Sequence, residues 1–176
     1  SYGMADPRAD VEVIALLWHI LHELGLPSLT LEINNLGQAA DREIYRPILV
    51  SYLKHHEAGL CGNCKHRIDA NPLRVLDCKV PECRIITEQA PRLSESLSET
   101  ARSYFAQVLA GLDLIHIPYS LNHRLVRGLD YYNLTTFEVT ATNLGAQNAV
   151  GAGGRYDGLV ETLGGASTPA VGFAVG

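Results

Sequence analysis

The sequence has few cysteines, little net charge and no long uninterrupted apolar run, and each scarcity excludes a class of protein. Four cysteines in 176 residues are too few for a disulfide scaffold, and their clustering favours reduced thiols or a metal in a cytoplasmic protein. The formal charge of −5 does not indicate a nucleic-acid partner, although a local basic face can still bind one. The most apolar stretch, residues 11–26, contains two glutamates and two histidines and is too short to cross a bilayer.

The composition is typical of a globular protein, since 47% of the residues are hydrophobic and can supply a sizeable core. The pattern divides into a helix and strand at residues 1–37, a mostly helical insertion at 38–116 and a β region at 117–176. Both ends of the chain adjoin segments with strong patterning, so we expect them to be cut points. Helices grouped against antiparallel strands predict an α+β fold.

Capping signals and periodicity locate the expected helices. Asp6 and Pro7 predict a helix start, as N-cap and first helical residue. Ser96 and Glu99 predict a capping box at the start of another long helix. Between them, an amphipathic helix is expected at roughly residues 39–56. Its predicted apolar face consists of Ile44, Ile48, Leu49, Tyr52 and Leu53.

Alternation and turn residues locate the expected strands. Residues 29–34 alternate, as do residues 136–141, and residues 149–152 and 170–175 are further short candidates. Asn143 and Gly145 suggest a hairpin turn after the second of these strands.

Two segments carry residue types suited to chemistry. Residues 127–132 (RGLDYY) place an arginine that can bind carboxylate or phosphate oxygens beside two flat, hydroxyl-bearing tyrosines. Residues 151–159 (GAGGRYDGL) combine glycines, which let a backbone approach a ligand, with Arg155, Tyr156 and Asp157, which could line its edge. No Gly-Lys-Ser/Thr follows, so this is not a P-loop. Taken separately, the first segment could equally be a structural turn, and the second is more often a tight turn between strands.

Taken together, these segments resemble the paired histidine-specific signatures of histidyl-tRNA synthetases. Residues 29–34 (LTLEIN), 71–77 (NPLRVLD) and 168–174 (TPAVGFA) extend the resemblance over nearly the whole chain. It implies part of a class II synthetase antiparallel sheet flanked by helices, with a mostly helical insertion. It also implies a parent enzyme, histidine–tRNA ligase, that uses ATP with Mg²⁺ to form histidyl-adenylate and transfers histidine to tRNA(His).

The resemblance implies site residues as well. In that family the arginine of the first segment contacts the histidine carboxylate and the ATP α-phosphate, so Arg127 would stabilise the charge developing between them. The other implied histidine or adenylate contacts are Tyr131, Tyr132, Gly153, Gly154 and Tyr156. Tyrosine hydroxyls would select the imidazole ring, because an analogue without the ring nitrogen leaves a hydroxyl unpaired. The glycines would let the backbone close on the substrate.

Other parts of the family are expected outside this sequence. The first two class II motifs, which supply the homodimer interface and an ATP-binding arginine, would precede residue 1. The third motif and the anticodon-binding domain would follow Gly176. We therefore expect this segment alone to be inactive and its parent to be active.

All four cysteines fall in the insertion. Cys61 and Cys64 have zinc-knuckle spacing, while Cys78 and Cys83 are more widely spaced. The sequence leaves two interpretations open, a structural Zn²⁺ site or four reduced thiols partly buried as small apolar side chains. His66 could replace one ligand. The surrounding segment lacks strong hydrophobic periodicity, which favours a metal that assists its folding.

The insertion also concentrates basic residues. In the resembled family an insertion at this place leans on the tRNA acceptor stem, so Arg67, Arg74 and Lys79 are candidate tRNA contacts. Nearby acidic residues leave the region only mildly basic, and an ordinary solvated face remains the alternative.

Two other functions compete with the synthetase interpretation. A non-catalytic paralogue, the regulatory subunit of ATP phosphoribosyltransferase in histidine biosynthesis, shares the synthetase fold, but the intact arginine signature and the long insertion argue against it. A zinc-stabilised nucleic-acid-binding module would account for residues 61–83 and leave the rest of the chain unexplained.

Overall fold

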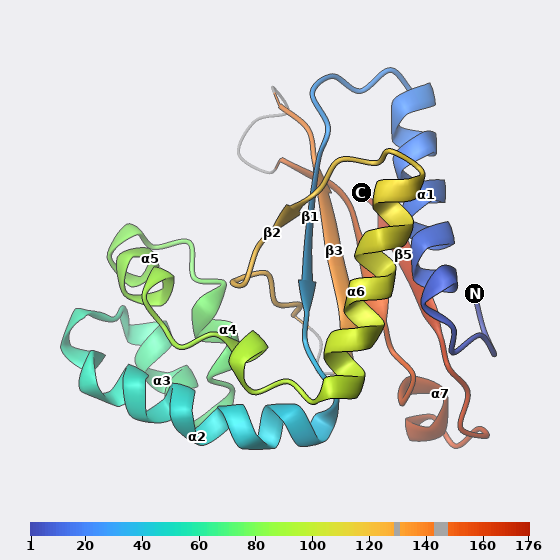
Figure 1. The fold of residues 1–176 in the computed structure, drawn as a ribbon. Helices are drawn as coiled ribbons and strands as arrows, with labels where there is room; N and C mark the ends of the chain where they lie inside the picture. The colour runs from blue at the N-terminus through green and yellow to red at the C-terminus, as the bar shows by residue number, and fades with distance from the viewer. Residues whose placement is uncertain (129–130, 143–147) are drawn as a thin grey trace.

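The sheet is built from both ends of the chain. The computed structural model describes residues 1–128, 131–142 and 148–176 (Figure 1). Within these ranges five strands form one sheet in the order β2-β1-β3-β4-β5. Their bounds are β1 Thr30–Asn35, β2 Ser120–Leu121, β3 Asn133–Thr140, β4 Ala149–Arg155 and β5 Val171–Val175. Neighbouring strands are antiparallel except β1 and β2, which are parallel. The predicted α+β class is confirmed.

Of the two strands predicted to alternate, β1 does so and β3 does so only in part. Leu31 and Ile33 of β1 are buried, as expected for one face of a sheet. In β3 the buried residues include Thr135 and Thr136, so this central strand is covered on both faces. The predicted hairpin turn at residues 143–145 lies outside the described residues. β3 and β4 on either side of it pair antiparallel, as a hairpin would require.

Two long helices cover the sheet. α1 (Pro7–Glu23) and α6 (Glu99–Leu114) run side by side next to it (Figure 1). α1 begins as predicted, with the Asp6 side chain accepting a hydrogen bond from the Arg8 backbone N–H and Pro7 in the first turn. Leu17 and Leu112 pack with Phe137 and Val139 in the core between helices and sheet. None of the helices in the described ranges is long and apolar enough to cross a membrane.

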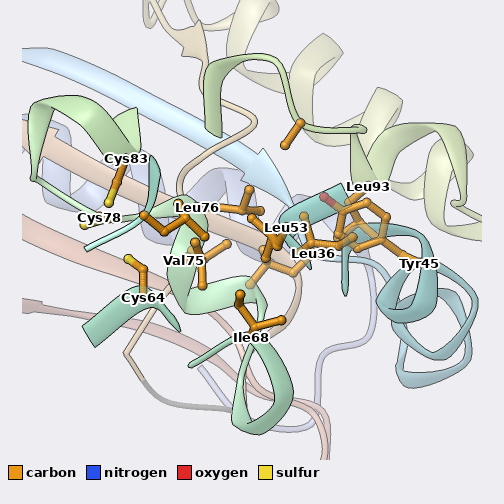
Figure 2. Packing of buried hydrophobic residues seen from close by; sticks show 14 of the residues in the cluster. Leu36, Tyr45, Leu53, Cys64, Ile68, Val75, Leu76, Cys78, Cys83 and Leu93 are labelled. Carbon is orange, nitrogen blue, oxygen red and sulfur yellow. The ribbon is translucent and has the colours of Figure 1, made fainter. Parts of the chain in front are cut away.

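The insertion forms a second packed unit beside the sheet (Figure 1). It contains α2 (Ala39–His55), η1 (Glu57–Gly59), α3 (Gly62–Ala70), α4 (Leu73–Leu76), α5 (Pro81–Glu88) and η2 (Leu93–Glu95). Figure 2 shows its own core, in which Leu53, Ile68, Val75 and Leu76 converge with three of the cysteines. The weak hydrophobic periodicity around the cysteines does not prevent burial, because these short helices each bury one or two residues without a long periodic stripe. The division of the chain into domains stays a prediction. α6 packs along α1, while Ala101 near its start belongs to the insertion core.

Two local predictions are wrong at least in part. On α2 the predicted Leu49 and Leu53 are buried, but Ile44 and Ile48 are exposed and Tyr45, which was not predicted, is buried instead. The N-cap of α6 is Ser98 rather than Ser96; its hydroxyl accepts a hydrogen bond from the backbone N–H of residue 101. A short helix that the sequence did not reveal, α7 (Leu159–Thr162), follows β4.

Candidate functional site

A groove lies where the insertion meets the sheet. It has a volume of about 1140 Å³ and is lined by residues from β1, β3, α4, α5 and the segment that precedes β3. Its cationic side chains are Arg74, Lys79, Arg84, Arg124 and Arg127. A neighbouring pocket of about 360 Å³, between α2 and α4, shares Arg74 and Arg127 with the groove. Arg127 therefore stands at the boundary between the two cavities.

The guanidinium of Arg127 is hydrogen-bonded through one nitrogen, while another nitrogen has no partner among the described residues. Its Nη1 donates to Glu138 Oε2 of β3 at 3.0 Å, and its guanidinium lies 6.0 Å from the centre of the Tyr132 ring. Its Nε is buried and has no hydrogen-bond partner among the described residues. Glu138 fixes the direction of the fork, and the guanidinium lines the groove, where it could bind an anion.

The three predicted tyrosines come together beside this arginine. Ring centres lie 4.7 Å apart for Tyr131 and Tyr132, 5.8 Å for Tyr131 and Tyr156, and 6.0 Å for Tyr132 and Tyr156. Burial raises the pKa of Tyr132 to about 12, and burial also raises the pKa of Tyr156. Both hydroxyls therefore stay protonated near neutral pH and can donate a hydrogen bond to a ring nitrogen.

The two predicted glycines of β4 are needed for this packing. A Cβ on Gly153 would lie 2.2 Å from the carbonyl oxygen of Gly172 on β5. A Cβ on Gly154 would lie 2.8 Å from the ring of Tyr132. Glycine at these positions lets β5 and the tyrosine approach the strand closely. Their predicted approach to a substrate stays a prediction.

Arg155 does not line a ligand. Its side chain is fully buried and binds Asp10 of α1 in two ways, through Nε at 3.1–3.2 Å and through Nη2 at 3.0 Å. Its Nη1 donates to Asp157 Oδ1 at 2.8 Å and to the carbonyl of Met4 at 3.0 Å. The prediction that the Arg155 side chain could line the edge of a bound ligand is therefore wrong. Sequence reasoning missed Asp10 altogether, since a single acidic residue in a first helical turn is ordinary.

The candidate tRNA contacts are only partly brought together. Arg74 and Lys79 line the groove, and both lie beside Asp77, at 3.8 Å and 2.8 Å. Arg74 also lies near Gly128, where a Cβ would be 3.3 Å from its Nη1. Arg67 lies on α3 and is not among the lining residues of the groove.

The four cysteines, by contrast, converge from separate elements. Their sulfur atoms all lie within 4.8 Å of one another, and all four are free thiols. Cys61 precedes α3, Cys64 lies in α3, Cys78 follows α4 and Cys83 lies in α5. A backbone N–H from Cys64 lowers the pKa of Cys61 to about 7, whereas burial raises the pKa of Cys64 and of Cys83. His66, offered as a substitute ligand, is not a member of this group.

Comparison with known proteins gives a consistent result. A sequence model of the family described as Histidyl-tRNA synthetase matches residues 73–176. The histidine–tRNA ligase of Anaeromyxobacter dehalogenans strain 2CP-1 is 51% identical over 176 residues, 100% of this chain and 42% of that protein. The one from Desulfatibacillum aliphaticivorans is 48% identical over 99% of this chain and 42% of that protein. The chain thus spans less than half the length of the curated relatives it matches.

Solved structures agree with this family. Apo S. aureus histidyl-tRNA synthetase superposes with a TM-score of 0.76 at 38% identity, over 99% of this chain and 43% of that one. A Bacillus halodurans protein described as an ATP phosphoribosyltransferase regulatory subunit/histidyl-tRNA synthetase has the same fold, with a TM-score of 0.62 at 21% identity and 99% and 49% coverage. The sequence match and the sheet with its helical insertion agree: this chain belongs to the histidyl-tRNA synthetase family.

Proposed function

We propose that residues 1–176 form part of the catalytic domain of a class II histidine–tRNA ligase. The full-length enzyme, a cytoplasmic homodimer, activates histidine with ATP and Mg²⁺ to histidyl-adenylate and transfers it to tRNA(His). The observation that carries the proposal is Arg127, fixed by Glu138 at the groove boundary with the three tyrosine rings beside it. Identity near 50% with histidine–tRNA ligases over the whole chain supports it.

The arrangement suits the first chemical step. The histidine carboxylate attacks the α-phosphate of ATP, and negative charge accumulates on the phosphate oxygens between them. The guanidinium of Arg127, whose Nε has no partner among the described residues, would meet this charge in a partly buried site, where a preplaced cation stabilises a transition state effectively. The tyrosine hydroxyls would hold the imidazole ring, and their raised pKa values keep them protonated as donors.

The regulatory-paralogue alternative has weaker support. A protein whose description includes that subunit shares the fold at 21% identity, which shows the fold alone. The histidine–tRNA ligases are more than twice as similar in sequence. Because the chain covers about 42% of these relatives, we propose that residues 1–176 alone lack activity and that the remaining motifs are supplied by the rest of the protein.

Arg127→Ala in the full-length protein tests the assignment. ATP–pyrophosphate exchange should fall by roughly a hundredfold or more, the usual effect of removing one charge-stabilising group. Histidine affinity should fall much less, because the arginine acts most strongly in the transition state. Arg102→Ala is the control for loss of an arginine outside the groove: Arg102 lies on α6 and forms only a long, exposed ion pair with Glu99 at 3.9 Å, so its loss should leave exchange unchanged.

Two results would contradict the proposal in different ways. Near-normal exchange in Arg127→Ala would remove this residue from catalysis, and with it the observation that carries the assignment. Histidine binding without any pyrophosphate exchange in the unaltered full-length protein would favour the regulatory paralogue.

A further inference from the structure

The insertion contains a cluster of sulfur atoms that the proposed catalysis does not use. The cysteine cluster consists of Cys61, Cys64, Cys78 and Cys83. The sulfurs of Cys61 and Cys78 are 3.9 Å apart, and all four lie within 4.8 Å of one another. Figure 2 shows Cys64, Cys78 and Cys83 pointing toward one another at one end of the insertion core.

These distances match a single tetrahedral metal ion. With Zn–S bonds of about 2.3 Å, tetrahedral geometry places the sulfurs about 3.8 Å apart. A polynuclear iron–sulfur cluster would hold its cysteine sulfurs farther apart, because several irons and sulfides lie between them. Four thiolates from two pairs are the usual ligands of a structural zinc site, which leaves no coordination position open for water.

The surroundings are arranged to accept negative charge on the sulfurs. The backbone N–H of Cys61 donates to the sulfur of Cys83 at 3.1 Å. The guanidinium of Arg124 stands beside the cluster, with its Nη2 donating to the carbonyl of Cys78 at 3.5 Å and its Nε to that of Leu76 at 3.2 Å. A zinc ion with four thiolates carries a net charge of −2, and these donors would offset part of it.

The distribution of the cluster along the chain argues against four unrelated buried thiols. Its members come from the turn before α3, from α3, from the loop after α4 and from α5. Cys64 and Cys83 are completely buried, and Cys78 is 8% exposed. Isolated apolar cysteines would be spread through the core and pack against carbon. Here three short elements direct their sulfurs to one point.

We propose that the cysteine cluster binds one structural zinc ion, releasing thiol protons as the four Zn–S bonds form. The ion joins the start of α3, the loop after α4 and α5, where helices of four to nine residues have little stability of their own. Through Arg124 it also steadies the segment that leads to Arg127. Zinc loss should therefore loosen the insertion first and the wall of the groove second.

The test uses the full-length protein, purified under reducing conditions without chelator. Elemental analysis should find one zinc per chain and no stoichiometric iron. A strong chelator should lower the melting temperature, and added Zn²⁺ should restore it. Protein refolded with Co²⁺ in place of Zn²⁺ should show the thiolate-to-metal absorption and d–d bands of a tetrahedral sulfur site.

Variants separate metal binding from packing. Cys64→Ser and Cys83→Ser should each reduce zinc to background. Ile86→Ala is the matched control, because Ile86 packs against the same core without offering a ligand. It should lower the melting temperature while zinc stays at one per chain.

Several outcomes would overturn the proposal. They are iron in place of zinc, disulfides among these cysteines in the native protein, or four thiols that react freely in metal-free, folded protein. Zinc retained in both serine variants would place the ion elsewhere. If the serine variants do not fold, the metal content of the unaltered protein and its response to chelator still decide. None of these measurements depends on aminoacylation, so the zinc site and the ligase assignment can fail separately.

Discussion

Replacing Asp10 by alanine should loosen α1 from the sheet, because Asp10 neutralises a guanidinium that has no access to water. Both side chains of the Asp10–Arg155 pair are fully buried, and three N–H···O contacts of 3.0–3.2 Å join them. The hydroxyl of Tyr104 on α6 donates to the same carboxylate. One carboxylate thus connects α1, α6 and β4.

The size of the effect follows from what Asp10→Ala leaves behind. Breaking a buried ion pair by removing one partner costs about 3–5 kcal/mol, mainly because the other charge stays buried. Asp157 still contacts Arg155 Nη1 at 2.8 Å, so the lower end, about 3 kcal/mol, is expected. Replacing both members, as in Asp10→Leu with Arg155→Met, should cost less than the sum of the single changes, since no charge remains buried.

Hydrogen exchange of α1 and β4 amides in the full-length protein measures this loss locally. A loss of about 3 kcal/mol should speed exchange through the open state roughly a hundredfold. Arg8→Ala breaks an exposed ion pair with Asp6 at the start of the same helix, and it should change the amide exchange rates little. If Asp10→Ala and Arg8→Ala had equal effects, the buried pair would not hold α1 on the sheet.

The remaining predictions concern the insertion. Asp41→Asn should destabilise the protein by about 1.5 kcal/mol, because the carboxylate accepts 2.8 Å hydrogen bonds from the backbone N–H groups of Gln38 and Ser98. Burial opposes ionisation of Asp41, but these hydrogen bonds outweigh it and lower the pKa of the carboxyl group in the folded protein below 3.8. The ionised carboxylate therefore stabilises the fold above pH 3.8, and this stabilisation is lost as the pH falls through the pKa of the folded state. Asp41→Asn should lack this loss of stability in an acid unfolding curve. Neutralising Arg67, Arg74 and Lys79 together should weaken tRNA binding and flatten its salt dependence, while pyrophosphate exchange stays unchanged. A fall in exchange would instead assign Arg74 to the active site.

Features that depend on neighbouring residues were predicted well from the sequence. The Asp6 cap of α1 is one example, because capping is decided within a single turn. The convergence of Tyr131 and Tyr156 beside the paired strands β3 and β4 was also expected, but from the family resemblance and not from neighbouring residues. The middle of the first signature, residues 129–130, lies outside the described residues.

Features decided by distant residues were missed. On α2 the buried Tyr45 donates to the carbonyl of Pro91, 46 residues away, whereas Ile44 is exposed, so the buried face is set by segments distant in sequence. The choice of Ser98 over Ser96 as the α6 cap depends on Asp41, 57 residues earlier, which accepts from the Ser98 backbone at 2.8 Å. The partnership of Asp10 and Arg155 spans 145 residues. Periodicity and spacing contain no information on such contacts.

The contacts of Arg124 explain why the insertion and the candidate active site need not be independent. Arg124 lies three residues before Arg127 and binds the carbonyls of Leu76 and Cys78 on the insertion. Arg74, also on the insertion, stands against Gly128 directly after Arg127. The segment that presents the candidate catalytic arginine is therefore flanked on both sides by insertion residues. A displacement of α4 or of the loop after it has to move these contacts, so the position of the insertion and the geometry of the Arg127 site are mechanically linked.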